Sequence, residues 1–291
     1  MPQLTANGIS LEYDTFGDPE KPALLLVMGL GAQMIGWDVE FCQLLADKGF
    51  HVIRFDNRDI GLSQSLDHLP IDAAAVLAGD FSSAPYRLSD MADDAAALLS
   101  ELGIDRAHVV GASMGGMIVQ ELLIRHADRL LSACSIMSTT GDPEVGHSTE
   151  EALAVLGAPP PQTAEQSGEA AIRAAKAFGS TGFPFDEERL RSRSVAAFER
   201  SRRPMGFLRQ FAAIRASGDR TEALHSVQVP TLVVHGDVDR LLDVSGGKAT
   251  AAAIPDSRLL VIPGMGHDLP MGAWPEIVDA IADNAARSAS V

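Results

Sequence analysis

The stretch Gly111-Ala112-Ser113-Met114-Gly115 decides the fold, because it joins two segments of different pattern. Residues 107–111 form a short apolar run of strand length, and residues 114–125 carry apolar side chains at helical spacing. A serine with glycine two residues away on each side predicts a tight strand-to-helix turn in which larger neighbours would collide. Such a turn projects the Ser113 hydroxyl beyond the strand, with the helix N-terminus aimed at it. The alternative is a glycine-rich turn whose serine only caps the helix.

Strand and helix patterns alternate on both sides of this turn. The continuous apolar runs are typical of strands that are covered on both faces of a parallel sheet. The chain is therefore predicted to be an α/β protein with a mostly parallel sheet and helices on both faces. Strands are predicted at residues 11–16, 23–28, 51–55, 107–111, 130–137, 229–235 and 258–262, and helices at 37–48, 89–102 (with Ser89 as N-cap), 114–125, 245–254 and 274–286.

The alternation stops between residues 141 and 226, where helical patterns are separated by Gly and Pro and no strand is convincing. Residues 139–224 hold 11 basic and 12 acidic residues, whereas the whole chain has a net charge of −16. A nearly neutral block inside an acidic chain indicates an insertion with its own surface. We predict a core of residues 1–138 and 227–291, interrupted by a helical cap of residues 139–226.

Composition narrows the class of protein further. The 291 residues are 46% hydrophobic and 21% charged, which is typical of a globular chain. A net charge of −16 argues against nucleic-acid and anionic membrane partners. The longest apolar run, residues 23–30, is too short for membrane insertion, and the N-terminal residues lack a signal-peptide pattern. Cys42 and Cys134 lie in apolar patterns and are predicted to be reduced core residues, so we expect a cytoplasmic protein. We expect it to be a monomer or a homodimer.

A serine hydroxyl needs a base to become a nucleophile. Eight histidines compete for this role, and only His267 combines a glycine-rich loop with a position just after the last predicted strand. We predict that His267 is the base; the alternative is a loop histidine that is hydrogen-bonded to the backbone. The base in turn needs an acid that orients it. Asp239, three residues beyond Gly236, is the predicted acid.

Two other aspartates are candidates for the acid. Asp237 directly follows a glycine and is interpreted as a turn residue, and Asp142 is the outside candidate. The oxyanion that forms during acyl transfer needs two backbone N–H donors. Met114, the residue after the serine, is the first predicted donor. Leu30, in the loop after the strand at residues 23–28, is the second.

At this point the chain resembles the α/β-hydrolase family over nearly its whole length. The matching pieces are residues 27–31, residues 55–63, the serine turn, the segment His-Gly-Asp-Val-Asp at 235–239, and Gly264-Met265-Gly266-His267. Within the family it is similar to small bacterial carboxylesterases and the aclacinomycin methylesterase type. The resemblance implies an eight-stranded sheet, a helical cap after the sixth strand, and no metal or cofactor. It places Ser113, Asp239 and His267 on the triad positions, and Leu30 and Met114 on the oxyanion positions.

The sequence departs from the family pattern in two places. Met28-Gly29 stands where His-Gly is usual, and Asp59 replaces a frequent glycine, which weakens the subgroup assignment. A serine at position 113, where the related haloalkane dehalogenases and epoxide hydrolases have aspartate, argues against those activities.

We therefore expect a serine carboxylic-ester hydrolase that acts on a small or medium, uncharged or apolar ester through an acyl-enzyme on Ser113. Thioester, amide or perhydrolase chemistry on the same triad is one alternative, and a non-catalytic ligand-binding receptor is another. Apolar residues are expected to line the substrate pocket: Met34, Met137, Phe178, Phe207, Phe211, Leu241 and Leu269.

Two clusters of charge were interpreted as structural. Six arginines between residues 189 and 203 alternate with glutamates, which favours a solvated, salt-bridged helix face over an anion clamp. Arg58 lies between Asp56 and Asp59, which favours a hydrogen-bonded knot that steadies a loop over a substrate contact.

Overall fold

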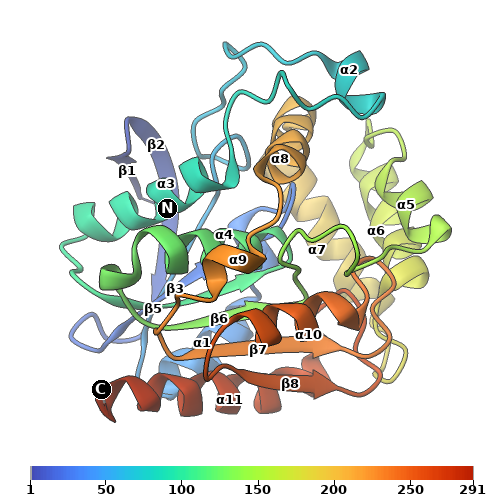
Figure 1. Cartoon of the computed structure of the whole chain (residues 1–291). Helices are drawn as coiled ribbons and strands as arrows, with labels where there is room; N and C mark the ends of the chain where they lie inside the picture. Colours follow the sequence, from blue (N-terminus) through green and yellow to red (C-terminus); the bar gives the residue numbers. More distant parts are fainter. Residues whose placement is uncertain (1, 291) are drawn as a thin grey trace.

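The apolar runs assemble into one eight-stranded sheet with the order β1-β2-β4-β3-β5-β6-β7-β8 (Figure 1). The computed structural model describes residues 2–290. Strands β1, β2 and β4 are paired antiparallel, and all neighbours from β4 to β8 are parallel. The predicted eight-stranded, mostly parallel α/β architecture is confirmed. The strands are β1 (Gln3–Ala6), β2 (Ile9–Phe16), β3 (Ala23–Val27), β4 (His51–Phe55), β5 (Ala107–Ala112), β6 (Leu130–Ile136), β7 (Thr231–Gly236) and β8 (Arg258–Ile262).

Helices cover both faces of the sheet and bury two apolar layers. Helices α3, α4 and α10 contribute to one layer, and α1 and α11 contribute to the other. The helices are α1 (Val39–Asp47), α2 (Ala73–Leu77), α3 (Leu88–Glu101), α4 (Met114–Arg125), α5 (Glu150–Leu156), α6 (Ala164–Phe178), α7 (Glu187–Arg200), α8 (Pro204–Ser217), α9 (Thr221–Leu224), α10 (Val244–Ala253) and α11 (Trp274–Ala286), with short 3-10 turns at Met34–Gly36, Ala127–Arg129, Met271–Ala273 and Arg287–Ser290.

The carboxyl ends of the parallel strands meet at one edge of the sheet. Val27 at the end of β3 pairs with Gly111 of β5, and Gly236 at the end of β7 pairs with Ile262 of β8. Strand β3 lies between β4 and β5. The chain therefore continues from β3 to β4 on one side of it, and the next strand, β5, is added on the other side. In open α/β sheets, ligands bind beyond the carboxyl ends at such a reversal.

Helices α5 to α9, here called the inserted helices, lie between β6 and β7 in the chain. Figure 1 shows α5, α6 and α7 on the side toward which the arrowheads of β7 and β8 point. Within this group α6 and α7 pack against each other, and α5 packs on α6. Helices α5, α6 and α7 therefore stand over the same edge of the sheet at which the loops after the strands meet, whereas α9 packs against α4 and α10 on one face of the sheet.

The structure also differs from the sequence expectations. The hairpin strand β1 was not predicted, although Asn7 and Gly8, both with positive φ, make its turn. The short helix α2 was missed as well. Ser89 is not the N-cap of α3: the helix begins one residue earlier, and the carboxylate of Asp90 accepts a hydrogen bond from the backbone of the N-cap Arg87 at 2.7 Å.

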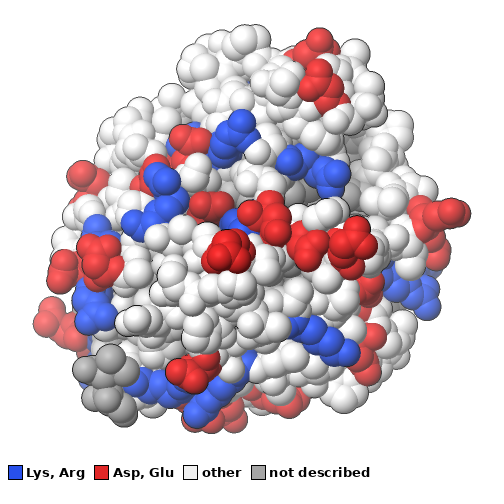
Figure 2. Space-filling model, viewed as in Figure 1, with Lys and Arg blue, Asp and Glu red and all other residues white. Residues whose placement is uncertain are grey.

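Both cysteines are free and buried, as predicted. None of the helices within residues 2–290 combines the length and the apolar character needed to cross a bilayer. On the face drawn in Figure 2, acidic and basic side chains are interleaved, with no broad basic area.

Candidate active site

Ser113 lies at a strained turn between β5 and α4. Its backbone has φ 56° and ψ −120°, a conformation that non-glycine residues rarely adopt. A Cβ on Gly111 would lie 2.1 Å from the Gly115 carbonyl oxygen, and one on Gly115 would lie 2.1 Å from that of Val27. Both positions therefore require glycine. The Ser113 side chain makes no capping hydrogen bond to α4, which excludes the interpretation of Ser113 as a simple helix cap.

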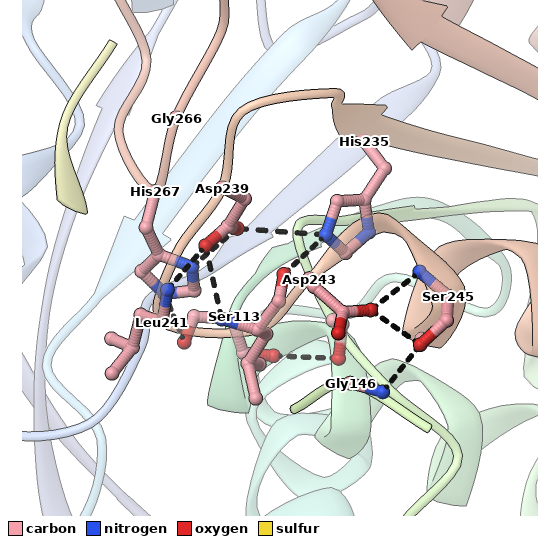
Figure 3. Close-up of polar contacts among 12 residues, drawn as sticks. Ser113, Gly146, His235, Asp239, Leu241, Asp243, Ser245, Gly266 and His267 are labelled. Atoms are coloured by element: carbon pink, nitrogen blue, oxygen red, sulfur yellow. Dashed lines mark hydrogen bonds and ion pairs between the residues drawn. The ribbon is translucent and has the colours of Figure 1, made fainter. Parts of the chain in front are cut away.

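The structure brings together the three side chains that the sequence singled out (Figure 3). The His267 Nε2 atom lies 2.9 Å from the Ser113 Oγ atom, and its Nδ1 atom lies 2.7 Å from Asp239 Oδ2. These contacts join residues from the loops after β5, β7 and β8. The Asp239 side chain is fully buried, and that of His267 is only 8% exposed. A serine, an imidazole and a carboxylate are thus linked in one chain of hydrogen bonds within a largely dry site.

The Asp239 carboxylate is held in its ionised form. Burial alone would raise its pKa, but His267 beside it and hydrogen bonds from His235, His267 and the Leu242 amide together hold the pKa of Asp239 below its usual range. The Oδ1 atom accepts the Leu241 and Leu242 amides, both at 2.9 Å. An anion that orients the imidazole and stabilises its protonated form is what a serine nucleophile requires.

The competing aspartates lie elsewhere. The Asp237 carboxylate accepts the Gly264 amide at 2.6 Å, in keeping with its interpretation as a turn residue. The Asp142 carboxylate accepts the Glu144 amide within its own loop.

His235 is a neighbour of the site that the sequence reasoning did not assign. It is buried, its Nε2 atom lies 2.8 Å from the Leu242 carbonyl oxygen, and the same atom is 3.5 Å from Asp239 Oδ2. Its position in the segment His-Gly-Asp-Val-Asp was the available signal. Since it holds the loop that carries Asp239, His235 is part of the support of that carboxylate.

The two backbone amides predicted as oxyanion donors flank the serine. Met114 follows Ser113 directly and begins α4. Leu30 follows Gly29, where a Cβ would lie 3.1 Å from Ser113 Cβ, so the loop after β3 passes against the serine. Within residues 2–290 neither the Leu30 nor the Met114 amide donates a hydrogen bond. Their role as oxyanion donors stays a prediction.

The predicted pocket residues are distributed around these loops. The Phe178 ring meets the His267 ring edge-on, with centroids 6.1 Å apart, and the Phe207 ring lies against Gly31. Leu241 follows Asp239 and Leu269 follows His267. Met34 and Met137 are buried, and Phe211 of α8 packs against Phe81 of the loop after α2. Their role in lining a pocket stays a prediction.

The charged knot holds the loops of the site. Asp56 accepts the Met34 amide at 2.7 Å and pairs with Arg200 of α7 at 2.6 Å. Arg58 pairs with Asp94, whereas Asp59 pairs with Arg209 of α8. The predicted partners of Arg58 were wrong, because it bonds to Asp94 and not to the adjacent Asp56 or Asp59. Apart from Arg200, whose side chain is 13% exposed, these groups are buried, which favours a structural role over a substrate contact.

The sequence predicted only some of the ion pairs that the arginine-rich segment makes. Arg189 and Arg193 pair with Asp38 of the core, and Arg191 pairs with Glu169 and Glu187, as expected of a salt-bridged face. Arg200 departs from that expectation, because its ion pair with the buried Asp56 ties α7 to the core.

Comparison with known proteins agrees with the fold. The family model described as the alpha/beta hydrolase fold matches residues 22–272. A rhodomycin D methylesterase of Streptomyces peucetius is 27% identical, over 99% of this chain and 98% of the relative. A 3-oxoadipate enol-lactonase of Acinetobacter baylyi is 34% identical over 43% of this chain and 40% of the relative. The crystal structure of the enol-lactonase of Burkholderia xenovorans covers 100% of both chains with a TM-score of 0.73 at 23% identity, which shows a shared fold.

The family model spans most of the chain. The eight-stranded sheet and the strained serine turn between a strand and a helix agree with the fold that it describes. The chain therefore belongs to the alpha/beta hydrolase fold family.

Proposed function

We propose that the protein is a serine carboxylic-ester hydrolase. His267 removes the Ser113 proton while the hydroxyl oxygen attacks the ester carbonyl. The amides of Leu30 and Met114 bind the oxyanion that forms. His267, now protonated and stabilised by Asp239, donates its proton to the leaving alcohol. Water activated by His267 then releases the acid from the acyl-enzyme on Ser113.

One observation carries the proposal: the Ser113 Oγ atom lies 2.9 Å from His267 Nε2, and His267 Nδ1 lies 2.7 Å from the buried carboxylate of Asp239. The two unpaired amides beside the serine add the second requirement of acyl transfer. The likeness to a methylesterase along nearly the full length of both chains supports an ester as the substrate. A lactone is a cyclic ester, so the partial likeness to an enol-lactonase fits the same chemistry.

We also propose that residues 139–226 form a cap over the site. Helices α5, α6 and α7 stand at the carboxyl edge of the sheet, and Phe178 of α6 and Phe207 of α8 reach His267 and Gly31. With a net charge of −16, the protein repels anionic substrates over long range. An uncharged or apolar ester of small or medium size therefore suits the site.

Replacement of the nucleophile tests the reaction. We expect Ser113→Ala to lower kcat by about 10⁴-fold or more, because the acyl-enzyme cannot form. The measurement is a series of p-nitrophenyl esters of increasing acyl length, with Ser226→Ala, an exposed serine on a distant loop, as the control. Retention of wild-type turnover in Ser113→Ala would exclude this mechanism.

The substrate class is tested separately with the wild-type enzyme. We expect a neutral ester to be hydrolysed about tenfold faster than its carboxylate-bearing analogue, because the acidic surface repels the latter. Faster turnover of the anion would contradict this expectation. A lactone, an acyl thioester, an anilide and peroxide-driven halogenation, measured in parallel, separate the alternative uses of the triad. Labelling of Ser113 by a fluorophosphonate without turnover of any substrate would instead indicate a receptor.

A further inference from the structure

The loop that carries His267 is bound to the inserted helices along its length. We call residues 264–268 the histidine loop and residues 178–182, which end α6 and follow it, the cap strap. The amides of Thr181 and Gly182 both donate to the Gly264 carbonyl oxygen, at 3.0 and 2.9 Å. A Cβ on Gly264 would lie 2.5 Å from Gly182 Cα. The two segments therefore pack backbone against backbone.

One hydroxyl on the cap strap holds both neighbours of His267. The Gly266 amide donates to Ser180 Oγ at 2.9 Å, and the same hydroxyl donates to Asp268 Oδ1 at 2.6 Å. The Ser180 amide also donates to Asp268 Oδ1, at 2.7 Å. Residues 266 and 268 are thus linked through Ser180 on either side of the imidazole.

The backbone of His267 itself is held by the same strap. Its amide donates to the Phe178 carbonyl oxygen at 2.7 Å, and the Phe178 ring meets the imidazole edge-on. Three consecutive residues of the histidine loop therefore hydrogen-bond to the cap strap. The bonds that aim the imidazole at Ser113 are only 2.9 and 2.7 Å long, and a displacement of about 1 Å at a reacting group costs roughly 100-fold in rate.

We propose that Ser180 and Asp268 are positioning residues for catalysis: the Ser180 hydroxyl, by linking Gly266 to Asp268, fixes the histidine loop so that His267 spans Ser113 and Asp239. The inference rests on the proposed role of His267 as the base. It makes the cap part of the catalytic apparatus, because the cap supplies the contacts that hold the base in place. A cap that only covered the substrate would leave the chemical step independent of these bonds.

The test compares kcat and KM for Ser180→Ala, Asp268→Ala and Asp268→Asn with a p-nitrophenyl ester. We expect each alanine variant to lower kcat by about 10- to 100-fold while KM changes by less than about threefold, because a misaligned base slows chemistry rather than binding. Asp268→Asn keeps an oxygen acceptor at the same place and should retain kcat within about threefold. The double variant should be little slower than the slower single variant, because both changes break the same linkage.

Ser167→Ala is the matched control. Ser167 is on α6, and its hydroxyl bonds to Ser194 of α7 within the cap, away from the histidine loop. It should lower the thermal midpoint of unfolding as Ser180→Ala does, yet leave kcat within about twofold. If Ser167→Ala lowers kcat as much as Ser180→Ala, the effect is one of cap stability and the proposal is wrong.

A second readout does not depend on ester turnover. Amide hydrogen exchange in a peptide that covers residues 264–269 should be faster in Ser180→Ala than in the wild type, and unchanged in Ser167→Ala. Equal exchange in Ser180→Ala and wild type, or faster exchange with wild-type kcat, would overturn the proposal. An inactive wild type that is not labelled by fluorophosphonate would instead reject the proposed function, and the exchange measurement would still decide whether the strap holds the loop.

Discussion

Two aspartates follow β7 two residues apart, and only one of them meets the histidine. Asp239 is buried and bonds to His267, whereas Asp237 is exposed and bonds to the Gly264 amide. The difference arises from the turn: Asp237 faces the end of β8, and the chain then bends inward so that the Leu241 and Leu242 amides close around Asp239. Identical side chains thus have different surroundings because of the backbone that carries them.

The assignment of the acid is tested by amide substitution at both positions. Asp239→Asn should lower kcat by about 10³- to 10⁴-fold, because a neutral amide neither stabilises the imidazolium nor selects the right tautomer. Asp237→Asn retains an acceptor for the Gly264 amide and should keep kcat within about threefold. The measurement is steady-state ester hydrolysis at neutral pH. The reverse order of effects would move the role to Asp237.

The sequence predicted Ser113, Asp239 and His267 because each follows a strand, and the ends of parallel strands must meet. No comparable rule identifies Ser180 or Gln210. Ser180 bonds to residue 268 and Gln210 bonds to residue 31, which are 88 and 179 positions away along the chain. Both lie among the inserted helices, and the packing of these helices on the core is set by shape rather than by a repeating pattern.

At the scale of the element, helix α8 reaches the loop that carries the Leu30 amide. Gln210 is fully buried, its Oε1 atom accepts the Gly31 amide at 2.9 Å, and its Nε2 atom donates to the Arg58 carbonyl oxygen at 2.9 Å. Gly31 has φ 68°, and a Cβ there would lie 2.5 Å from the Phe207 ring. Helix α8 therefore holds the conformation of this loop through the hydrogen bond from the Gly31 amide to Gln210 and the contact of Phe207 with Gly31.

Gln210→Met is expected to slow the chemical step. The Gly31 amide loses its acceptor, so the adjacent Leu30 donor is less well placed, and removal of one oxyanion donor costs about 100-fold or more in kcat. A partial displacement should give about a tenfold loss, with weaker binding of a trifluoromethyl ketone that mimics the tetrahedral intermediate.

The control for this variant is Gln120→Met. Gln120 is equally buried, but it bonds to Arg220 and Thr250, away from the oxyanion loop. It should lower stability without weakening the binding of the ketone. Equal affinity of Gln210→Met and wild type for the ketone would contradict the expected role of α8.

The strands and the core helices were predicted to within a few residues, since their patterns repeat and their ends carry glycine. Two elements show where such patterns fail. β1 has only four residues, and its burial does not alternate cleanly, so it is visible only through its pairing with β2. In α7 the charges suggest a solvated helix, yet Arg200 at its end is paired with the buried Asp56. The spacing of charges alone does not distinguish a partner in solvent from one in the core.

At the scale of the whole molecule, stability depends on pH through a buried histidine of the sheet. Burial, with a smaller contribution from Arg106, lowers the pKa of His108 in β5 from 6.5 to about 4. The unfolded chain therefore binds a proton below about pH 6.5 that the folded chain does not take up until about pH 4. The contribution of neutral His108 to stability is complete above this window and is lost as the pH falls through it.

The free energy of unfolding in urea is therefore expected to fall by about 2 kcal/mol, from this group alone, between about pH 7.5 and about pH 5. His108→Gln removes the titrating group and should flatten the profile over this interval, even if it lowers stability at both ends. The Nδ1 atom of His108 lies 2.8 Å from Ser132 Oγ, and the side-chain amide of glutamine can make a hydrogen bond to the same hydroxyl. If the free energy of unfolding of the variant falls with pH as steeply as that of the wild type, other groups cause the loss of stability at low pH.

The close contact between Ser180 and Asp268 limits which inserts the core of this protein can carry. An insert transplanted from a relative would bring new side chains to the substrate, but it would also have to offer a hydroxyl where the core presents its carboxylate. Substrate range and turnover would then change together rather than one at a time. A chimera of this core with a foreign insert should recover activity when residue 268 and its partner across the boundary are exchanged as a pair.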